Sequence, residues 1–198
     1  MPKQQVWSAT PGRLMLLFVL SVLAAPVEYL AHEGAHYLAA RGFGVPASLH
    51  FDQVHLPGIE LLSDVQTLVI VAAGPAVDWI AGLIGVAFVV VRFTPMRLVL
   101  AIWVARPLQF VPALIGIDVP YFGLGGSLRG TDEVTIATVL KLPPHTVIWL
   151  ELAAALPLLA VIVCAVPAGC RLAALSVMST GVLAGWAGWL ALGNLALP

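Results

Sequence analysis

Long apolar stretches separated by short polar breaks dominate the pattern of this chain. A helix needs roughly 20 consecutive apolar residues to cross a bilayer. Five stretches reach about this length, and segments with proline, glycine or charged residues separate them. They cover residues 14–40, 67–91, 98–117, 146–166 and 172–197. The pattern predicts an all-α polytopic membrane protein with about five transmembrane helices in a single membrane-embedded domain, residues 1–198.

Residues 42–66, between the first two stretches, follow a different period. Glycine and proline are frequent there, and apolar Ala47, Leu49 and Phe51 alternate with polar residues. Alternation of this kind is typical of a strand. We expect a short membrane-associated β hairpin after the first helix. Because a free strand edge can pair with an extended peptide, Leu49 and Phe51 are candidate substrate-binding residues.

Composition agrees with a membrane protein and excludes one class of partner. Hydrophobic residues make up 61% of the 198 residues and charged residues 10%, against about 25% charged in an average soluble domain. The net charge is −1 and no basic stripe is present, so a nucleic-acid partner is not expected. We expect a multi-pass integral protein of a prokaryotic cell (inner) membrane, in contact with the lipid bilayer.

The first apolar stretch ends in a motif with metal-ligand spacing. His32-Glu33-Gly34-Ala35-His36 is an HExxH, and on a helix its two histidines, four residues apart, share one face. Glu33 is offset from both, in the position of a general base that takes a proton from a water at the metal. Three ionisable groups within five residues of a membrane helix are costly unless they pair, face water or hold an ion. We therefore predict a zinc site with His32 and His36 as ligands.

A catalytic zinc needs a third protein ligand and an open position. Asp132 is the preferred candidate because it follows a glycine-rich connection, residues 118–144, and begins a segment that can be helical. Glu133, Asp118, Glu151 and Asp78 remain as rivals.

Two further acidic residues are candidates for supporting roles at the site. Glu28 precedes His32 by four residues, so it is a candidate for the carboxylate that accepts the second ring N–H of that histidine. Pairing of Glu28 with Arg106 is the alternative. Asp78 is a candidate for lining the substrate cavity, where Arg106 could neutralise its charge.

These motifs together resemble the site-2 protease family of intramembrane zinc metalloproteases. The resemblance rests on the HExxH with its helical continuation over residues 37–42, on Ala73-Gly74-Pro75 in a later span, and on an aspartate beyond the next span. It implies one Zn2+ per chain bound by His32, His36 and Asp132, with Glu33 as the catalytic base. The implied substrate is a transmembrane segment of another protein, cleaved in or near the membrane. Asp78 and Glu133 stand where the family has asparagine and glycine.

The resemblance covers residues 14–140, the metalloprotease core, and residues 145–198 are expected to be additional transmembrane helices. No insertion is long enough for a PDZ or CBS domain, so the chain is similar to a minimal form of the family. A zinc protease with Glu151 as third ligand is one alternative. A catalytically inactive pseudoprotease or a metal-binding membrane protein that also uses His50 and His55 is another.

Gly181 and Gly185 form a GxxxG in the last span, which permits close helix packing. Packing within the chain is the favoured interpretation, and a homo-oligomer through this face is the alternative. The orientation in the membrane stays open, because the lysine and arginine count weakly places the N-terminus inside whereas the resemblance implies the reverse.

Overall fold

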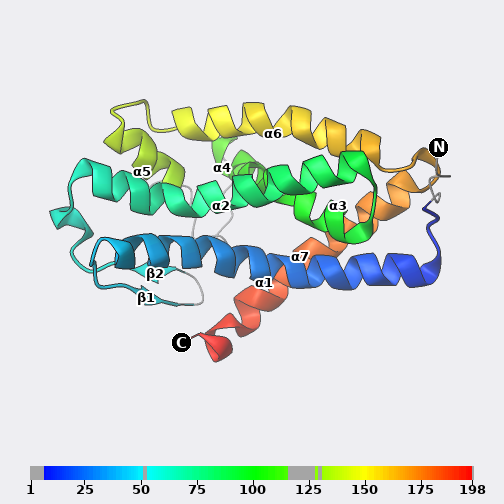
Figure 1. The fold of residues 1–198 in the computed structure, drawn as a ribbon, viewed down its shortest axis with the longest axis horizontal. Coiled ribbons are helices and arrows are strands. Elements are labelled where there is room, and N and C mark those ends of the chain that lie inside the picture. The colour runs from blue at the N-terminus through cyan, green and yellow to red at the C-terminus, as the bar shows by residue number, and fades with distance from the viewer. Residues whose placement is uncertain (1–6, 51–52, 116–127, 129–130, 198) are drawn as a thin grey trace.

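Four long apolar helices form the body of the protein. The computed structural model describes residues 7–50, 53–115, 128 and 131–197. Within these, α1 (Pro11–Gly42), α2 (Asp64–Val91), α6 (Thr146–Ala165) and α7 (Arg171–Ala196) are long and apolar enough to cross a membrane. Figure 1 shows α1, α2 and α6 along the long axis of the molecule, with α7 crossing them obliquely. The predicted all-α membrane architecture is confirmed.

The segment predicted as a third span is not one continuous α-helix. It divides into α3 (Pro95–Ala101), the 3₁₀ helix η2 (Ile102–Phe110) and α4 (Val111–Leu114). Pro107 lies inside η2 and cannot donate a backbone hydrogen bond, which weakens an α-helix at this point. Arg106, next to it, forms an ion pair with the buried Asp78 of α2. The irregular helix therefore carries a charged side chain into the bundle, which periodicity alone did not indicate.

The predicted hairpin is present at the C-terminal end of α1. Strand β1 (Ser48–Leu49) pairs antiparallel with β2 (Val54–His55), with Leu49 opposite Val54. The 3₁₀ helix η1 (Ile59–Leu61) follows, and a capping box between Ser63 and Gln66 starts α2. The hairpin and the short helix α5 (Asp132–Val139) lie at the same end of the molecule (Figure 1).

Helices α1 and α7 pack closely where glycines of α7 meet the α1 backbone. A Cβ added to Gly185 would lie 2.2 Å from the Val22 carbonyl oxygen, and one added to Gly181 would lie 2.7 Å from Ser21 Cβ. Pro26 of α1 has no N–H for the Val22 carbonyl, four residues earlier. The missing side chain at Gly185 lets α7 approach this oxygen. The Gly181 and Gly185 face is thus used within the chain, as the intrachain interpretation predicts.

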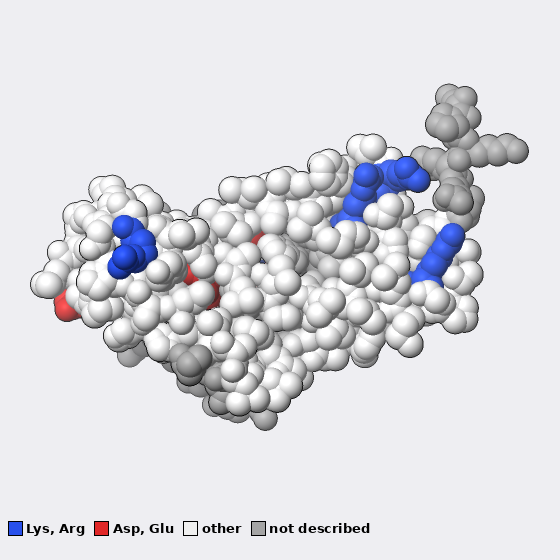
Figure 2. Space-filling view, turned by 60° about the horizontal axis from the view of Figure 1, so that its bottom comes forward, with Lys and Arg blue, Asp and Glu red and all other residues white. Residues whose placement is uncertain are grey.

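The lysine and arginine side chains visible in Figure 2 gather at the ends of the molecule, whereas the ion pair of Asp78 and Arg106 lies inside the bundle. Figure 2 shows one face on which Lys and Arg lie at the two ends of the elongated body, and the surface between them is almost entirely uncharged. Large apolar side chains such as Leu23, Leu83 and Leu156 are exposed along the helices. An apolar belt between two charged ends is the surface that a bilayer solvates. The protein is an integral membrane protein by this criterion.

Candidate metal centre

Two histidines of α1 face inward near its C-terminal end. His32 and His36 are 1% and 6% exposed, and their Nε2 atoms lie 3.0 Å apart. The four-residue spacing places the two rings edge to face on the side of α1 that packs against α2. At 1.5 Å per residue, these histidines lie about 9 to 15 Å along the helix from its end at Gly42. The site is therefore inside the bundle, near the C-terminal end of α1.

Asp132 completes the cluster from a distant part of the sequence. It is the first residue of α5, which Thr131 caps by accepting a hydrogen bond from the Val134 N–H. Its Oδ2 lies 2.9 Å from His32 Nε2 and 3.2 Å from His36 Nε2. Among the described residues, His32, His36 and Asp132 form the group of side chains whose ligand atoms converge closely enough for a metal ion.

The spacing of the three atoms fits a small tetrahedral ion. Zinc bonds of about 2.0–2.1 Å place tetrahedral ligand atoms roughly 3.3 Å apart, close to the 2.9–3.2 Å found here. Two neutral imidazoles and a carboxylate are also a donor set that zinc accepts. The residues present therefore fit a divalent ion of this kind.

Gly74 of α2 keeps open the space in front of the two histidines. A Cβ at this position would lie 2.3 Å from His36 Nε2 and 2.6 Å from His32 Nε2. These lengths approach those of metal–nitrogen bonds, so a methyl group would occupy the volume that an ion needs. The space that an ion needs thus explains why glycine, and not a larger residue, stands at position 74 of Ala73-Gly74-Pro75.

The second nitrogen of each ring has an acceptor on α2. His32 Nδ1 lies 2.7 Å from Asp78 Oδ2, and His36 Nδ1 lies 2.7 Å from the Ile70 carbonyl oxygen. Donation from both Nδ1–H groups directs the Nε2 lone pair of each ring toward the space that the two histidines share with Asp132. Glu28 was one candidate for the acceptor of His32, with pairing to Arg106 as its alternative. In the structure Asp78 of the facing helix occupies the acceptor position at Nδ1.

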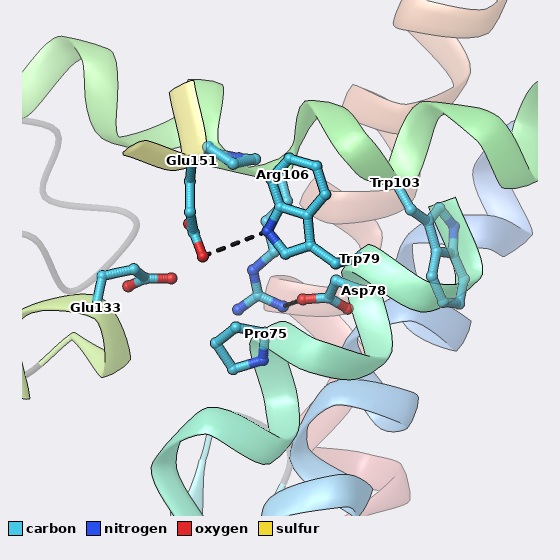
Figure 3. Close-up of a pocket in the computed structure, with 8 residues that line it drawn as sticks. Pro75, Asp78, Trp79, Trp103, Arg106, Glu133 and Glu151 are labelled. Carbon is cyan, nitrogen blue, oxygen red and sulfur yellow. Dashed lines mark hydrogen bonds and ion pairs between the residues drawn. The ribbon is translucent and has the colours of Figure 1, made fainter. Parts of the chain in front are cut away.

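Arg106 ties this arrangement to η2. Its guanidinium forms an ion pair with Asp78 (Figure 3) and lies beside both ring nitrogens of His32, with Nη2 3.1 Å from Nε2. The predicted neutralisation of Asp78 by Arg106 is confirmed. The predicted substrate contact of Asp78 is not supported, since this residue is 2% exposed and its Oδ2 bonds His32 and Arg106.

Glu33 lies at the edge of the cluster and does not join the ligand group. Its Oε1 is 4.0 Å from His32 Nε2, and its Oε2 accepts a hydrogen bond of 3.0 Å from the Val54 N–H. The hairpin strand β2 therefore fixes one carboxylate oxygen, and the other faces the space near the histidines. This is the geometry of a base positioned for a water molecule.

The other predicted site residues lie apart from the metal-ligand cluster. Glu133 and Glu151 face a neighbouring pocket, and Glu151 accepts a hydrogen bond from Trp79 Nε1. In the hairpin, His50 contacts Ser48 Oγ, His55 is exposed and Leu49 is half-buried. The candidates Phe51 and Asp118 lie outside the described residues.

The carboxyl groups of α5 have opposite pKa shifts. In the metal-free protein, burial alone would raise the pKa of Asp132, but the charges and Nε2–H hydrogen bonds of His32 and His36, whose rings then carry hydrogen on both nitrogens, outweigh it and hold that pKa far below its usual value. Burial raises the pKa of Glu133, and the charge of the neighbouring Asp132 adds to this effect. Asp132 is thus ionised at neutral pH, as a metal ligand must be.

Sequence reasoning missed the two backbone groups of this site. The Ile70 carbonyl and the Val54 N–H belong to apolar residues with no local signal. Gly74 could have been singled out from the sequence, because glycine lets a backbone lie close to a bulky group or a ligand.

No family model, no curated protein and no solved structure matches the chain.

Proposed function

We propose that this protein is an intramembrane zinc metalloprotease that hydrolyses peptide bonds in or near transmembrane segments. The observation that carries the proposal is the cluster of His32 Nε2, His36 Nε2 and Asp132 Oδ2 within 3.2 Å of one another, with the Glu33 carboxylate beside it. Zinc, one ion per chain, would lower the pKa of a water and polarise the peptide carbonyl. The motif resemblance to the site-2 protease family supports the same reaction.

Protein groups supply the proton transfer and the orientation of the histidines. Glu33 takes the proton of the attacking water at Oε1 and later delivers it to the leaving amine, since one group can serve as base and then as acid. Asp78 and the Ile70 carbonyl keep the two imidazoles in the tautomer that presents Nε2. The apolar helices around them exclude bulk water, which strengthens each of these electrostatic interactions.

The substrate would be a membrane-spanning segment with its backbone unwound near the site. Helical backbone shields its carbonyls from attack, so the cut requires an extended stretch. The hairpin is placed to hold one, because β2 contacts Glu33 through the Val54 N–H. A prokaryotic inner membrane is the proposed location.

Metal content and turnover test the proposal together. We expect purified wild type and Glu33→Gln to hold about one zinc per chain, and His32→Ala and Asp132→Ala to lose it. Glu33→Gln should also lose cleavage of a transmembrane substrate by a factor of about 100 or more, since general acid–base catalysis contributes about 100- to 10,000-fold. Glu60→Gln, at an exposed position of η1, is the matched control, and Glu151→Gln tests the alternative third ligand.

The same variants separate the alternatives. A metal-binding membrane protein would tolerate Glu33→Gln in every assay, and zinc loss in Glu151→Gln would favour the alternative third ligand. A wild-type protein without zinc would refute the protease proposal.

A further inference from the structure

Four arginines lie at the end of the molecule where α1 and α7 begin and α2 passes into α3 (Figure 1). The segments meet there, because the rings of Trp7 and Phe93 contact at a centroid distance of 5.2 Å and Cys170 Sγ lies 3.9 Å from the Trp7 carbonyl oxygen. This end is about 28 Å along α1 from the metal-ligand cluster. We call it the arginine end, after Arg13, Arg92, Arg97 and Arg171.

The positive charge of the arginine end has no acidic counterpart in the described part of the chain. The ion pairs among the described residues all lie in or beside the metal-ligand cluster. At the opposite end of the molecule, exposed Glu60 and Asp64 accompany exposed Arg41 and Lys141. No aspartate or glutamate occurs in the three segments that form the arginine end, residues 7–13, 91–97 and 166–171.

Hydrogen bonds within the chain hold two of the four guanidinium groups in place. Arg97 Nη1 donates to the carbonyl oxygens of Phe88 and Arg92, at 3.2 and 3.1 Å. Arg171 Nε donates to the carbonyl oxygen of Val166 at 3.2 Å. These carbonyls lie at the C-terminal ends of α2 and α6, where a cation is favoured. A guanidinium has five N–H groups, so both arginines keep donors for a partner outside the chain.

Large apolar side chains stand next to these arginines on the outer surface. Val91, Met96 and Leu172 are 75%, 63% and 81% exposed, and each is adjacent in sequence to an arginine. A soluble anion does not explain such neighbours, whereas a phospholipid presents a phosphate group beside hydrocarbon chains. The arginines also stand where long apolar helices begin or end, which is the level of the lipid headgroups in a bilayer.

We propose that the arginine end binds the phosphate groups of anionic phospholipids, with the acyl chains against Val91, Met96 and Leu172. Arginine suits this partner because its planar fork binds phosphate through two parallel N–H···O bonds. Lipids with a net negative charge are favoured, because each arginine near an anionic lipid surface adds to the attraction. Because several helices meet at this end, a bound lipid contacts them together and stabilises the folded protein by mass action. The site is separate from the proposed hydrolysis.

Native mass spectrometry of the detergent-solubilised protein tests this site. The protein is titrated with dioctanoyl phosphatidylglycerol, which is anionic, and with dioctanoyl phosphatidylcholine, which has the same chains and no net charge. We expect the anionic lipid to bind at least tenfold more tightly. The double variant Arg13→Gln/Arg92→Gln should bind it about 25-fold more weakly than wild type, from roughly fivefold for each arginine near an anionic surface.

The double variant leaves the packing of the helices intact. Arg13 Nη1 donates to Ser8 Oγ at an exposed position, and the Arg92 side chain has no hydrogen bond within the described residues. Thermal unfolding without lipid should therefore give the wild-type melting temperature. Arg41→Gln, at an exposed position of the opposite end, is the matched control and should bind the anionic lipid like wild type.

Three results would overturn the inference. They are equal affinity for the two lipids, unchanged binding in the double variant, and a loss in Arg41→Gln as large as in the double variant. Displacement of the lipid by inorganic phosphate at equal concentration would also overturn it, because the arginine end would then bind a free anion. None of these measurements depends on zinc or on cleavage, so their outcome is separate from that of the protease proposal.

Discussion

Replacement of Gly74 by alanine is the most direct test of the metal centre. The added Cβ would lie 2.3 Å from His36 Nε2 and 2.6 Å from both Nε2 and Cε1 of His32. Carbon and nitrogen atoms that are not bonded stay about 3.5 Å apart. The rings or α2 must therefore move by roughly 1 Å. Metal sites hold their ligands to within about 0.2 Å of ideal distances, so this displacement disrupts the site.

We expect Gly74→Ala to weaken zinc binding by about 100-fold or more, since loss of a supporting contact alone costs about 10- to 100-fold. Zinc affinity is measured by competition with a chelator of known affinity, on protein purified in detergent. Thermal unfolding with and without zinc gives a second readout, because an ion that binds the folded state stabilises it by mass action. The wild type should gain stability from zinc, and Gly74→Ala should not.

Two other glycines serve as controls. A Cβ on Gly34, within the HExxH, meets nothing within 4 Å, so Gly34→Ala should bind zinc normally. A Cβ on Gly82 would lie 2.6 Å from Val104 Cγ1, away from the cluster, so Gly82→Ala should lose stability and keep zinc. Wild-type zinc affinity in Gly74→Ala would refute the argument that the ion lies against α2.

Three further substitutions have defined outcomes. Asp78→Asn should weaken zinc binding roughly tenfold in the same chelator competition, because the His32 Nδ1–H loses a charged acceptor; unchanged affinity would mean that Asp78 does not support this ligand. Gly185→Ala should destabilise the protein by about 1–3 kcal/mol in thermal unfolding, because the methyl group would separate α7 from α1, and Gly188→Ala, in open space, should not. Val54→Pro removes the N–H that holds Glu33, so cleavage should fall about tenfold with zinc retained, and full activity would show that this hydrogen bond is dispensable.

Local geometry explains which parts of the site could be predicted from the sequence. The four-residue spacing predicts that His32 and His36 share one face of a helix, with Glu33 beside them. The helix α1 that carries them is predictable from its apolar composition alone. The short strands were predictable for the same reason, since the alternation around Leu49 is local. These features require no knowledge of how helices pack.

Tertiary packing decides the features that were open or wrong. Asp132 was one of five acidic candidates, and nothing in its sequence neighbourhood distinguishes it from Glu133. The orientation at the start of α5, where Thr131 caps the helix, is what presents Asp132 to the histidines and Glu133 to the pocket. Glu28 was a candidate acceptor for His32 because it lies one turn away, but the facing helix supplies Asp78 at this position.

The metal centre also has a mechanical role in this architecture. Its ligands join α1 to α5 across 96 to 100 residues of sequence, and α5 is a helix of eight residues. A helix this short has little stability of its own. An ion bound by Asp132 and both histidines would therefore fix α5 against the bundle. Loss of zinc is then expected to loosen α5 as well as the reaction centre.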